Sequence, residues 1–196
     1  MTLTVDTLTS WMNNFADKIE VNKQYLSDLD TPIGDGDHGF NMSRGMKAVR
    51  EKLTTKPVDL QAGFKNIAMA LISTVGGASG PLYGTAFLEM AKKSSSTDDL
   101  GELLKAALAG IQKRGGAKPG DKTMVDVWSE LVPEVKAGTL SKDKIERAVE
   151  STKDMVAKKG RASYLGERSK GHVDPGSESS GYLFEALLET EGLLCV

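Results

Sequence analysis

The sequence predicts an all-α protein with about eight helices. Apolar residues recur at three- and four-residue spacing in separate stretches, which places them on one face of a helix in each case. No stretch shows the sustained alternation of apolar and polar residues, enriched in β-branched and aromatic side chains, that indicates a strand. Short polar breaks separate several of the stretches, as in antiparallel helices that follow one another up and down.

The first apolar stripe predicts a long helix. It passes through Leu8, Trp11 and Phe15 and reaches toward Leu29, and we expect the helix to end near Pro32. Seven further stripes follow in order, at residues 40–53, 60–72, 82–91, 100–111, 124–135, 145–156 and 182–187. Each stripe predicts one more helix.

The breaks between the stripes are of two kinds. Residues 54–58, 92–98 and 137–141 form short, mostly polar turns. Residues 34–39, 76–80, 115–120 and 160–176 are rich in glycine, and most carry aspartate, serine, threonine or arginine beside it. In an up-and-down arrangement the two kinds alternate, so all four glycine-rich loops are expected at one end of the molecule. Glycine there allows backbone N–H groups to approach a ligand closely.

Composition is that of an ordinary globular protein. The chain has 196 residues, of which 39% are hydrophobic and 27% charged, so residues 1–196 are expected to form a single domain around one core. The formal net charge of −2 provides no basic field for nucleic acid, which is therefore excluded as a direct partner.

Targeting and redox signals are also missing from the sequence. The N-terminal stretch lacks the basic start and apolar run of a signal peptide, and no apolar stretch is long enough to span a bilayer. We therefore expect a cytoplasmic protein without a membrane partner. The single cysteine, Cys195, is expected to be a free, ordinary thiol.

Three aspartates make the most informative cluster. Asp30, Asp35 and Asp37 stand five and two residues apart across a helix end and a glycine-containing turn, so their carboxylates can converge. Converging like charges require a cation, and oxygen ligands without nearby cysteine favour a hard one, magnesium before zinc. The alternative is that these aspartates are turn formers and helix caps, a common role for aspartate beside glycine.

Three familiar motifs nearly match and are rejected. Residues 34–39 have the spelling of the dinucleotide fingerprint, but no strand precedes them. An EF-hand loop starting at Asp35 fails, because Phe40 and Met46 stand where glycine and glutamate belong. Residues 115–123 come within one residue of a P-loop, but Asp121 is inserted before the lysine.

The second and third glycine-rich loops both open helices. Ser79 is the expected cap of a helix with Pro81 at its first position, and Thr85 offers a further hydroxyl to a phosphate. In the third loop, Asp121 or Thr123 is the expected cap, with Met124 just inside and able to lie against an adenine ring. The alternatives are a tight glycine crossing between packed helices and a methionine that belongs to the core.

The last glycine-rich segment, residues 160–176, is expected to be a long structureless loop with a function. It offers Arg161 as a fork for phosphate and Asp174 for a metal or ribose contact. A solvated connection is the alternative. His38 and His172 are the two histidines, and each could act as an acid or base or simply as a hydrogen-bonding group.

Taken in order, these motifs resemble the L domain of dihydroxyacetone kinases essentially from end to end. The matching segments are the aspartate cluster, 77–80 (Gly-Ala-Ser-Gly), 120–124 (Gly-Asp-Lys-Thr-Met), 160–168 (Gly-Arg-Ala-Ser-Tyr-Leu-Gly-Glu-Arg) and 174–176 (Asp-Pro-Gly). The resemblance implies an eight-helix antiparallel barrel that holds ADP or ATP at one end with two Mg²⁺ ions. By the same resemblance Asp30, Asp35 and Asp37 are the magnesium ligands. The implied nucleotide-binding residues are His38, Gly39, Phe40, Asn41, Ser79, Gly80, Gly115, Met124, Arg161, Asp174, Pro175 and Gly176.

In length, this chain resembles the members of one of the two forms of that family. Some members fuse this domain to a K domain, whereas this chain resembles the separate ADP-binding subunit of the bacterial phosphotransferase-system enzyme. In that form a phosphohistidine-carrying M subunit converts bound ADP to ATP in place, and the γ-phosphoryl passes to dihydroxyacetone on the K subunit. No catalytic nucleophile is then expected from this chain. The alternatives are a module that reports its nucleotide state, such as a transcriptional co-regulator, and a kinase subunit for another acceptor.

Overall fold

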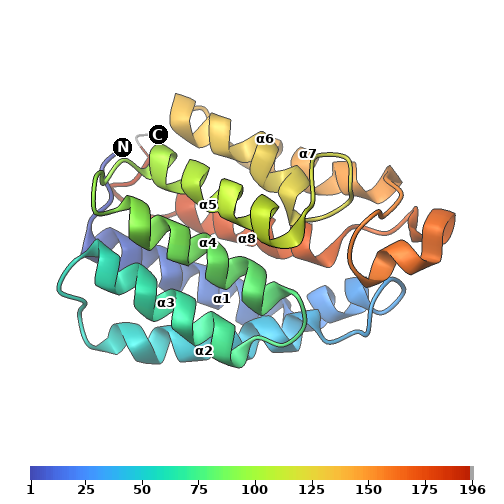
Figure 1. Cartoon of the computed structure of the whole chain (residues 1–196), viewed down its shortest axis with the longest axis horizontal. Coiled ribbons are helices and arrows are strands. Elements are labelled where there is room, and N and C mark those ends of the chain that lie inside the picture. Colours follow the sequence, from blue (N-terminus) through green and yellow to red (C-terminus); the bar gives the residue numbers. More distant parts are fainter. Residues whose placement is uncertain (195–196) are drawn as a thin grey trace.

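The computed structural model describes residues 1–194 and consists almost entirely of helices (Figure 1). The α-helices are α1 Val5–Asp30, α2 His38–Thr54, α3 Leu60–Thr74, α4 Ser79–Lys93, α5 Leu100–Gly115, α6 Met124–Ala137, α7 Lys142–Glu150 and α8 Pro175–Leu188. Two 3₁₀ segments, η1 Ser151–Asp154 and η2 Arg161–Ser169, lie between α7 and α8. The described residues contain no strand, only an isolated bridge between Thr2 and Asp99. The prediction of an all-α fold is confirmed.

Consecutive helices pack against one another all around the molecule. Each of α1 to α7 contacts the next helix in the chain, and α8 contacts α1, so the neighbours close a ring. The helices lie roughly along the long axis, with the N-terminus and the end of α8 at one end and the α1–α2 loop and η2 at the other (Figure 1). The short turns and the glycine-rich loops therefore lie at opposite ends of the molecule.

One hydrophobic core joins all eight α-helices. The predicted stripe of α1 is buried, with Trp11 and Phe15 fully inaccessible to solvent. The indole N–H of Trp11 donates to the carbonyl of Leu183 at 2.9 Å, and Trp128 meets Phe184 edge-on with ring centroids 5.3 Å apart. These contacts explain why the three- and four-residue spacing predicts the helices well: the stripe is the face that the core requires.

The stripe at residues 145–156 was predicted as one helix, and this is wrong at its C-terminal end. α7 ends at Glu150, and Met155 lies beyond the 3₁₀ turn that follows. The hydroxyl of Ser151 donates to the carbonyl of Ala148 at 2.7 Å, and that of Thr152 donates to Val149 at 2.8 Å. Such side-chain bonds compete with the continued helix and explain its early end.

The prediction of a structureless loop at residues 160–176 is also wrong. Most of the segment is η2, and α8 already begins at Pro175. Serine hydroxyls stabilise η2 locally: Ser163 donates to the carbonyl of Gly160 at 2.6 Å, and Ser169 to that of Gly166 at 2.7 Å. The apolar pattern did not predict the start of α8, because the first turns of this helix are rich in buried serine.

No helix in the described part of the chain is both long and apolar enough to cross a membrane. Cys195, expected to be a free thiol, lies outside the described residues.

Candidate nucleotide and metal site

A pocket of about 360 Å³ opens at the end of the molecule where the glycine-rich loops lie. All four loops contribute to its wall, so the predicted convergence at one end is confirmed. Twelve of the predicted site residues line it: Asp30, Asp35, Asp37, His38, Asn41, Ser79, Gly115, Met124, Arg161, Asp174, Pro175 and Gly176. The volume is within the range of ordinary small-molecule sites.

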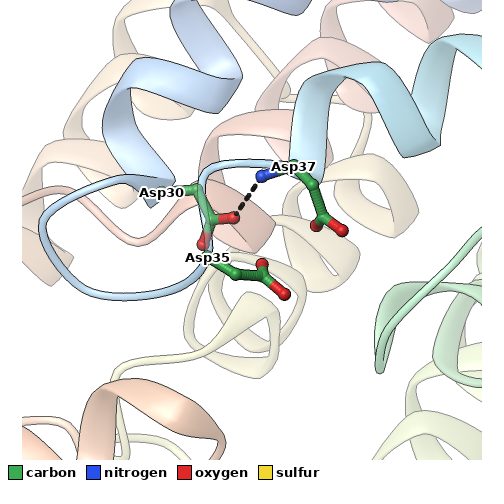
Figure 2. Close-up of side chains that lie close together, drawn as sticks. All are labelled: Asp30, Asp35 and Asp37. Atoms are coloured by element: carbon green, nitrogen blue, oxygen red, sulfur yellow. Dashed lines mark hydrogen bonds between the residues drawn. The ribbon is translucent and has the colours of Figure 1, made fainter.

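The three predicted metal ligands meet at one edge of this pocket. One carboxylate oxygen from each of Asp30, Asp35 and Asp37 lies within 4.8 Å of the other two. Asp30 is buried at the end of α1, and its Oδ2 accepts a hydrogen bond from the backbone N–H of Asp37 at 3.1 Å (Figure 2). The same oxygen accepts the backbone N–H of His38 at 3.3 Å. Asp30 thus fixes the entry of α2, and Asp35 and Asp37 are exposed.

Glycine at position 34 is required by the same arrangement. A Cβ added there would lie 2.0 Å from Oδ1 of Asp30, well inside van der Waals contact. Two residues later, Gly36 has φ +76°, a conformation that side chains rarely adopt. Both glycines are therefore needed to fold the turn around the Asp30 carboxylate.

The electrostatics of the cluster favour a cation. Burial raises the pKa of the Asp30 carboxyl above its ordinary value, the two backbone N–H groups oppose that rise, and Asp35 adds to it. Nη1 of Arg161 lies 2.5 Å from Oδ2 of Asp35 and neutralises part of the charge. Three carboxylates without nitrogen or sulfur ligands form the donor set that a hard divalent cation such as Mg²⁺ prefers.

His38 lies at the start of α2 and is buried between two hydroxyl groups. Its Nε2 is 2.9 Å from Oγ of Ser179, and its Nδ1 is 3.1 Å from Oγ of Ser79. Burial lowers the pKa of His38 to about 4, whereas Asp35 acts in the opposite direction. The imidazole is therefore neutral at neutral pH, and it serves as a hydrogen-bonding group.

The prediction that Ser79 caps its helix is wrong. α4 begins at Ser79 itself, and its N-cap Ala78 makes no side-chain cap bond within the described residues. Pro81 is the third helical residue, and it has no N–H to satisfy. The hydroxyl of Thr85 donates to the carbonyl of Pro81 at 2.7 Å, which engages its hydrogen within the helix.

Thr123, one of the two predicted caps, is the N-cap of α6. It forms a capping box with Asp126, whose Oδ2 accepts the Thr123 backbone N–H at 2.8 Å. Lys122 beside it is buried, with φ +58°, and its ammonium donates to the carbonyls of Thr152 at 2.7 Å and Lys153 at 3.3 Å. Burial lowers the pKa of Lys122. This lysine joins the α6 loop to η1, whereas a P-loop lysine would face the phosphates.

Asp174 is the N-cap of α8 and lies in the pocket wall. Its Oδ2 accepts hydrogen bonds from the backbone N–H of Ser177 at 2.7 Å and from the Ser177 hydroxyl at 2.9 Å. Burial raises the pKa of Asp174 to about 6, although these two hydrogen bonds oppose the rise. Pro175 follows at the first helical position, where its missing N–H costs nothing.

Three predicted residues are not in the wall of the pocket as far as the described residues define it: Gly39, Phe40 and Gly80. A Cβ on Gly39 would lie 1.8 Å from the carbonyl oxygen of Lys23, and one on Gly80 would lie 2.3 Å from that of Val75. These glycines allow close helix crossings. Phe40 is 47% exposed on the outer side of α2.

The pocket lining also includes residues that the sequence did not predict. Arg114 and Lys159 bring positive charge to the wall, and Leu82 and Ile111 bring apolar surface. Arg114 and Lys159 each stand directly before a glycine of a glycine-rich loop, and that position was a usable signal. The sequence did not mark Leu82 and Ile111 as pocket residues, because both also belong to the apolar stripes of their helices.

The class of protein follows from fold and pocket together. An all-α chain with a three-carboxylate cluster beside a glycine-walled pocket matches the DAK2 domain, whose family model covers residues 32–189. Residues 1–194 also have the fold of the dihydroxyacetone kinase of C. freundii in complex with AMP-PNP and Mg²⁺, with a TM-score of 0.77 at 23% identity. That likeness covers 97% of this chain and 35% of the kinase.

Two relatives of similar length place the chain more narrowly. It is 54% identical to the PTS-dependent dihydroxyacetone kinase, ADP-binding subunit DhaL, of Lactococcus lactis, over 95% of this chain and 98% of that protein. It is 50% identical to the ADP-binding subunit of PEP-dependent dihydroxyacetone kinase 1 of Listeria innocua, over 97% and 99%. The chain therefore belongs to the family of ADP-binding subunits of phosphoenolpyruvate-dependent dihydroxyacetone kinases, as the motifs predicted.

Proposed function

We propose that this chain binds ADP in the pocket through two Mg²⁺ ions and serves as the nucleotide-carrying subunit of a dihydroxyacetone kinase. The observation that carries the proposal is the meeting of Asp30, Asp35 and Asp37 at the pocket edge, in a chain that is similar over 95% of its length to an ADP-binding subunit. Magnesium bound to these carboxylates would offset the negative charge of a diphosphate, which otherwise repels them.

The nucleotide is the carrier of the phosphoryl group between two partners. We propose that an M subunit with a phosphohistidine transfers its phosphoryl to bound ADP, and that the resulting ATP transfers it to dihydroxyacetone on a K subunit. Histidine and dihydroxyacetone phosphate are the products, and ADP is restored. This chain then needs no nucleophile of its own, because positioning and charge neutralisation are most of what a protein contributes to phosphoryl transfer.

The remaining pocket residues have roles that follow from their chemistry. The start of α4 is without a side-chain cap in the described structure, so its backbone N–H groups can face an anion. Arg161 can leave Asp35 for a phosphate oxygen once magnesium neutralises that aspartate. Met124, Leu82 and Ile111 provide the apolar surface that an adenine ring requires. All eight α-helices share one core, which supports the proposal that residues 1–196 form one L-type domain.

The decisive experiment follows the phosphoryl group. The purified chain is mixed with phosphoenolpyruvate labelled with ³²P, the general phosphotransferase proteins, an M subunit and a K subunit. Label is expected first in nucleotide bound to this chain and then in dihydroxyacetone phosphate. Mass spectrometry of the supernatant after denaturation is expected to find ADP. A chain that is free of nucleotide and does not bind Mg²⁺-ADP would refute the proposal.

Kinases for other acceptors contain similar domains, and this supports a second candidate. The chain is 37% identical to part of the L-erythrulose 1-kinase of Mycolicibacterium smegmatis, over 86% of this chain and 32% of that protein. The acceptor would be set by the K subunit, because the pocket of this chain would hold the phosphoryl donor. Offering erythrulose beside dihydroxyacetone in the transfer experiment separates the two acceptors.

A further inference from the structure

A chain of buried hydrogen bonds runs from the core toward the pocket. At its inner end the indole N–H of Trp128 donates to Oγ of Ser180 at 3.0 Å. The hydroxyl of Tyr83 lies 3.0 Å from Oγ of Ser180 and 2.9 Å from Oγ of Ser179. All four side chains are fully buried, so each polar group depends on the next for its partner.

The outer half of the chain reaches the pocket through the imidazole of His38. Oγ of Ser179 lies 2.9 Å from Nε2 of His38, and Nδ1 of His38 lies 3.1 Å from Oγ of Ser79. Both His38 and Ser79 line the pocket. Five hydrogen bonds thus connect Trp128 of α6 to the first residue of α4.

Which group donates in each hydrogen bond can be worked out from the two ends of the chain of hydrogen bonds. An indole nitrogen only donates, and a phosphate oxygen of bound nucleotide only accepts. Between these ends each hydroxyl has one hydrogen, and a neutral imidazole has one N–H. If every link points outward, Ser180 donates to Tyr83, Tyr83 to Ser179, Ser179 to Nε2 of His38, and Nδ1–H of His38 to Ser79. The hydrogen of the Ser79 hydroxyl is then directed into the pocket.

The opposite direction of these hydrogen bonds would leave Ser79 without a hydrogen for an acceptor in the pocket. Oγ of Ser179 also lies 3.2 Å from the carbonyl of Gly176, a longer contact than its 2.9 Å contact with His38. If Ser179 donates there, His38 has its hydrogen on Nε2, and Ser79 must donate inward to Nδ1. The oxygen lone pairs of Ser79 would then face the pocket, and they would repel a phosphate.

We propose that Tyr83, Ser179 and His38 are positioning residues that direct the hydroxyl hydrogen of Ser79 onto a phosphate oxygen of the nucleotide. The inference rests on the proposed function, since it requires an anionic nucleotide in the pocket. It assigns a binding role to Tyr83 and Ser179, two side chains that are not in the pocket lining as the described residues define it. It also links the phosphate to the helix core, because this chain of five hydrogen bonds, called the relay below, spans α2, α4, α6 and α8.

The position of the hydrogen on His38 is directly measurable. The protein contains two histidines, so ¹⁵N-histidine labelling gives two sets of ring signals, and a His172→Gln variant assigns them. In the presence of Mg²⁺-ADP the signals of His38 are expected to show hydrogen on Nδ1. Hydrogen on Nε2 alone in the bound state would overturn the proposal.

A double-mutant cycle tests the relay by affinity. Tyr83→Phe removes one hydroxyl, and we expect it to weaken Mg²⁺-ADP binding about fivefold, whereas Ser79→Ala weakens it about tenfold or more because a charge-assisted bond is lost. In the Ser79→Ala background Tyr83→Phe is expected to have no further effect, since the relay then ends at no phosphate. Effects that multiply in the double variant would overturn the proposal.

Matched controls separate the relay from general stability. Tyr182→Phe removes another tyrosine hydroxyl, one that bonds Glu178 and is not in the pocket lining as the described residues define it, and affinity is expected to stay unchanged. If Tyr83→Phe does not fold, Ser180→Ala replaces it in the cycle, with folding checked by thermal melting in EDTA. If the unsubstituted protein binds Mg²⁺-ADP but the losses of affinity from the two substitutions multiply in the double variant, only this inference is overturned. Failure of the unsubstituted protein to bind Mg²⁺-ADP defeats the proposed function as well.

Discussion

Four helices of this molecule have an aspartate at the N-cap position, but only three of these aspartates act as caps. Asp59 of α3, Asp99 of α5 and Asp174 of α8 each accept the backbone N–H three residues further on, at 2.7, 2.9 and 2.7 Å. Asp37, at the start of α2, makes no such bond within the described residues. The same residue at the same helix position therefore does two different things.

Backbone conformation explains the difference. Asp59 has extended backbone, φ −155° and ψ 176°, which folds its carboxylate back over the helix end, whereas Asp37 has φ −111° and ψ −3°. The first N–H groups of α2 are satisfied by other side chains: Asp30 accepts those of Asp37 and His38, and Ser27 accepts that of Gly39 at 3.2 Å. The Asp37 carboxylate is thereby released toward Asp30 and Asp35, which favours the metal-ligand interpretation over that of a cap.

The largest expected effect comes from removing the two exposed charges of the cluster. In the Asp35→Asn, Asp37→Asn double variant we expect Mg²⁺-ADP affinity to fall by more than about a hundredfold, since losing even an indirect partner of a bound metal costs up to that much. The melting temperature in EDTA is expected to stay equal or to rise, because repulsion within the cluster is relieved. The exposed Arg161–Asp35 pair contributes little to set against that gain.

Calorimetric titration with Mg²⁺-ADP and thermal melting in EDTA, run side by side, check this pattern. If the aspartates only form the turn, asparagine replaces them well and neither property changes. Unchanged affinity in the double variant would remove the metal assignment. A fall in both affinity and EDTA stability would point to a structural role for the cluster.

Asp174 differs from the other capping aspartates because it both caps a helix and borders the pocket. Below about pH 4 its carboxyl is protonated in the folded and the unfolded chain alike. Between about pH 4 and the folded-state pKa of about 6, the unfolded chain ionises first, so the free energy of unfolding falls as pH rises. Above that range both states are ionised, and the cost of the buried charge stays constant.

Asp174→Asn removes this titration but keeps an oxygen for the cap. We expect the variant to gain on the unsubstituted protein as pH rises from about 4 to about 6, by about 2 kcal/mol once water in the pocket is allowed for. Urea unfolding of both proteins at several pH values between 4 and 8, in EDTA, measures the difference. A difference that is flat across this range would show that Asp174 titrates normally in the folded protein.

The sequence predicts the helices where the core decides them. The stripe of Trp11 and Phe15 predicts α1 because burial of that face is what stabilises the helix. The sequence does not predict η2 or the start of α8. There, serine hydroxyls such as those of Ser163 and Ser169 stabilise the backbone by local hydrogen bonds. Such bonds leave no apolar period in the sequence.

In the site, too, the sequence predicts only those contacts that leave a pattern in it. Spacing predicts that Asp30, Asp35 and Asp37 converge, since the turn between them is short. The direction of Lys122 could not be predicted, because its ammonium is held by carbonyls of η1, and a 3₁₀ turn leaves no pattern that marks those carbonyls as acceptors. The hydrogen bond between Ser79 and His38 could not be predicted for a similar reason, since the two residues lie on different helices.

The smallest expected effect is the sharpest test of the difference between Asp37 and the capping aspartates, because it reverses the pattern expected of the Asp35→Asn, Asp37→Asn double variant. Asp59→Ala removes a cap at the end far from the pocket, and we expect it to cost about 1 kcal/mol of unfolding free energy and to leave Mg²⁺-ADP affinity unchanged. Asp37→Ala, the matched change at the same helix position in α2, is expected to leave the free energy of unfolding in EDTA within about 0.5 kcal/mol, as an aspartate that caps nothing should. It is expected to weaken Mg²⁺-ADP binding strongly. Urea unfolding in EDTA and calorimetric titration on both variants give four numbers, and equal losses of stability would mean that Asp37 caps α2 in solution.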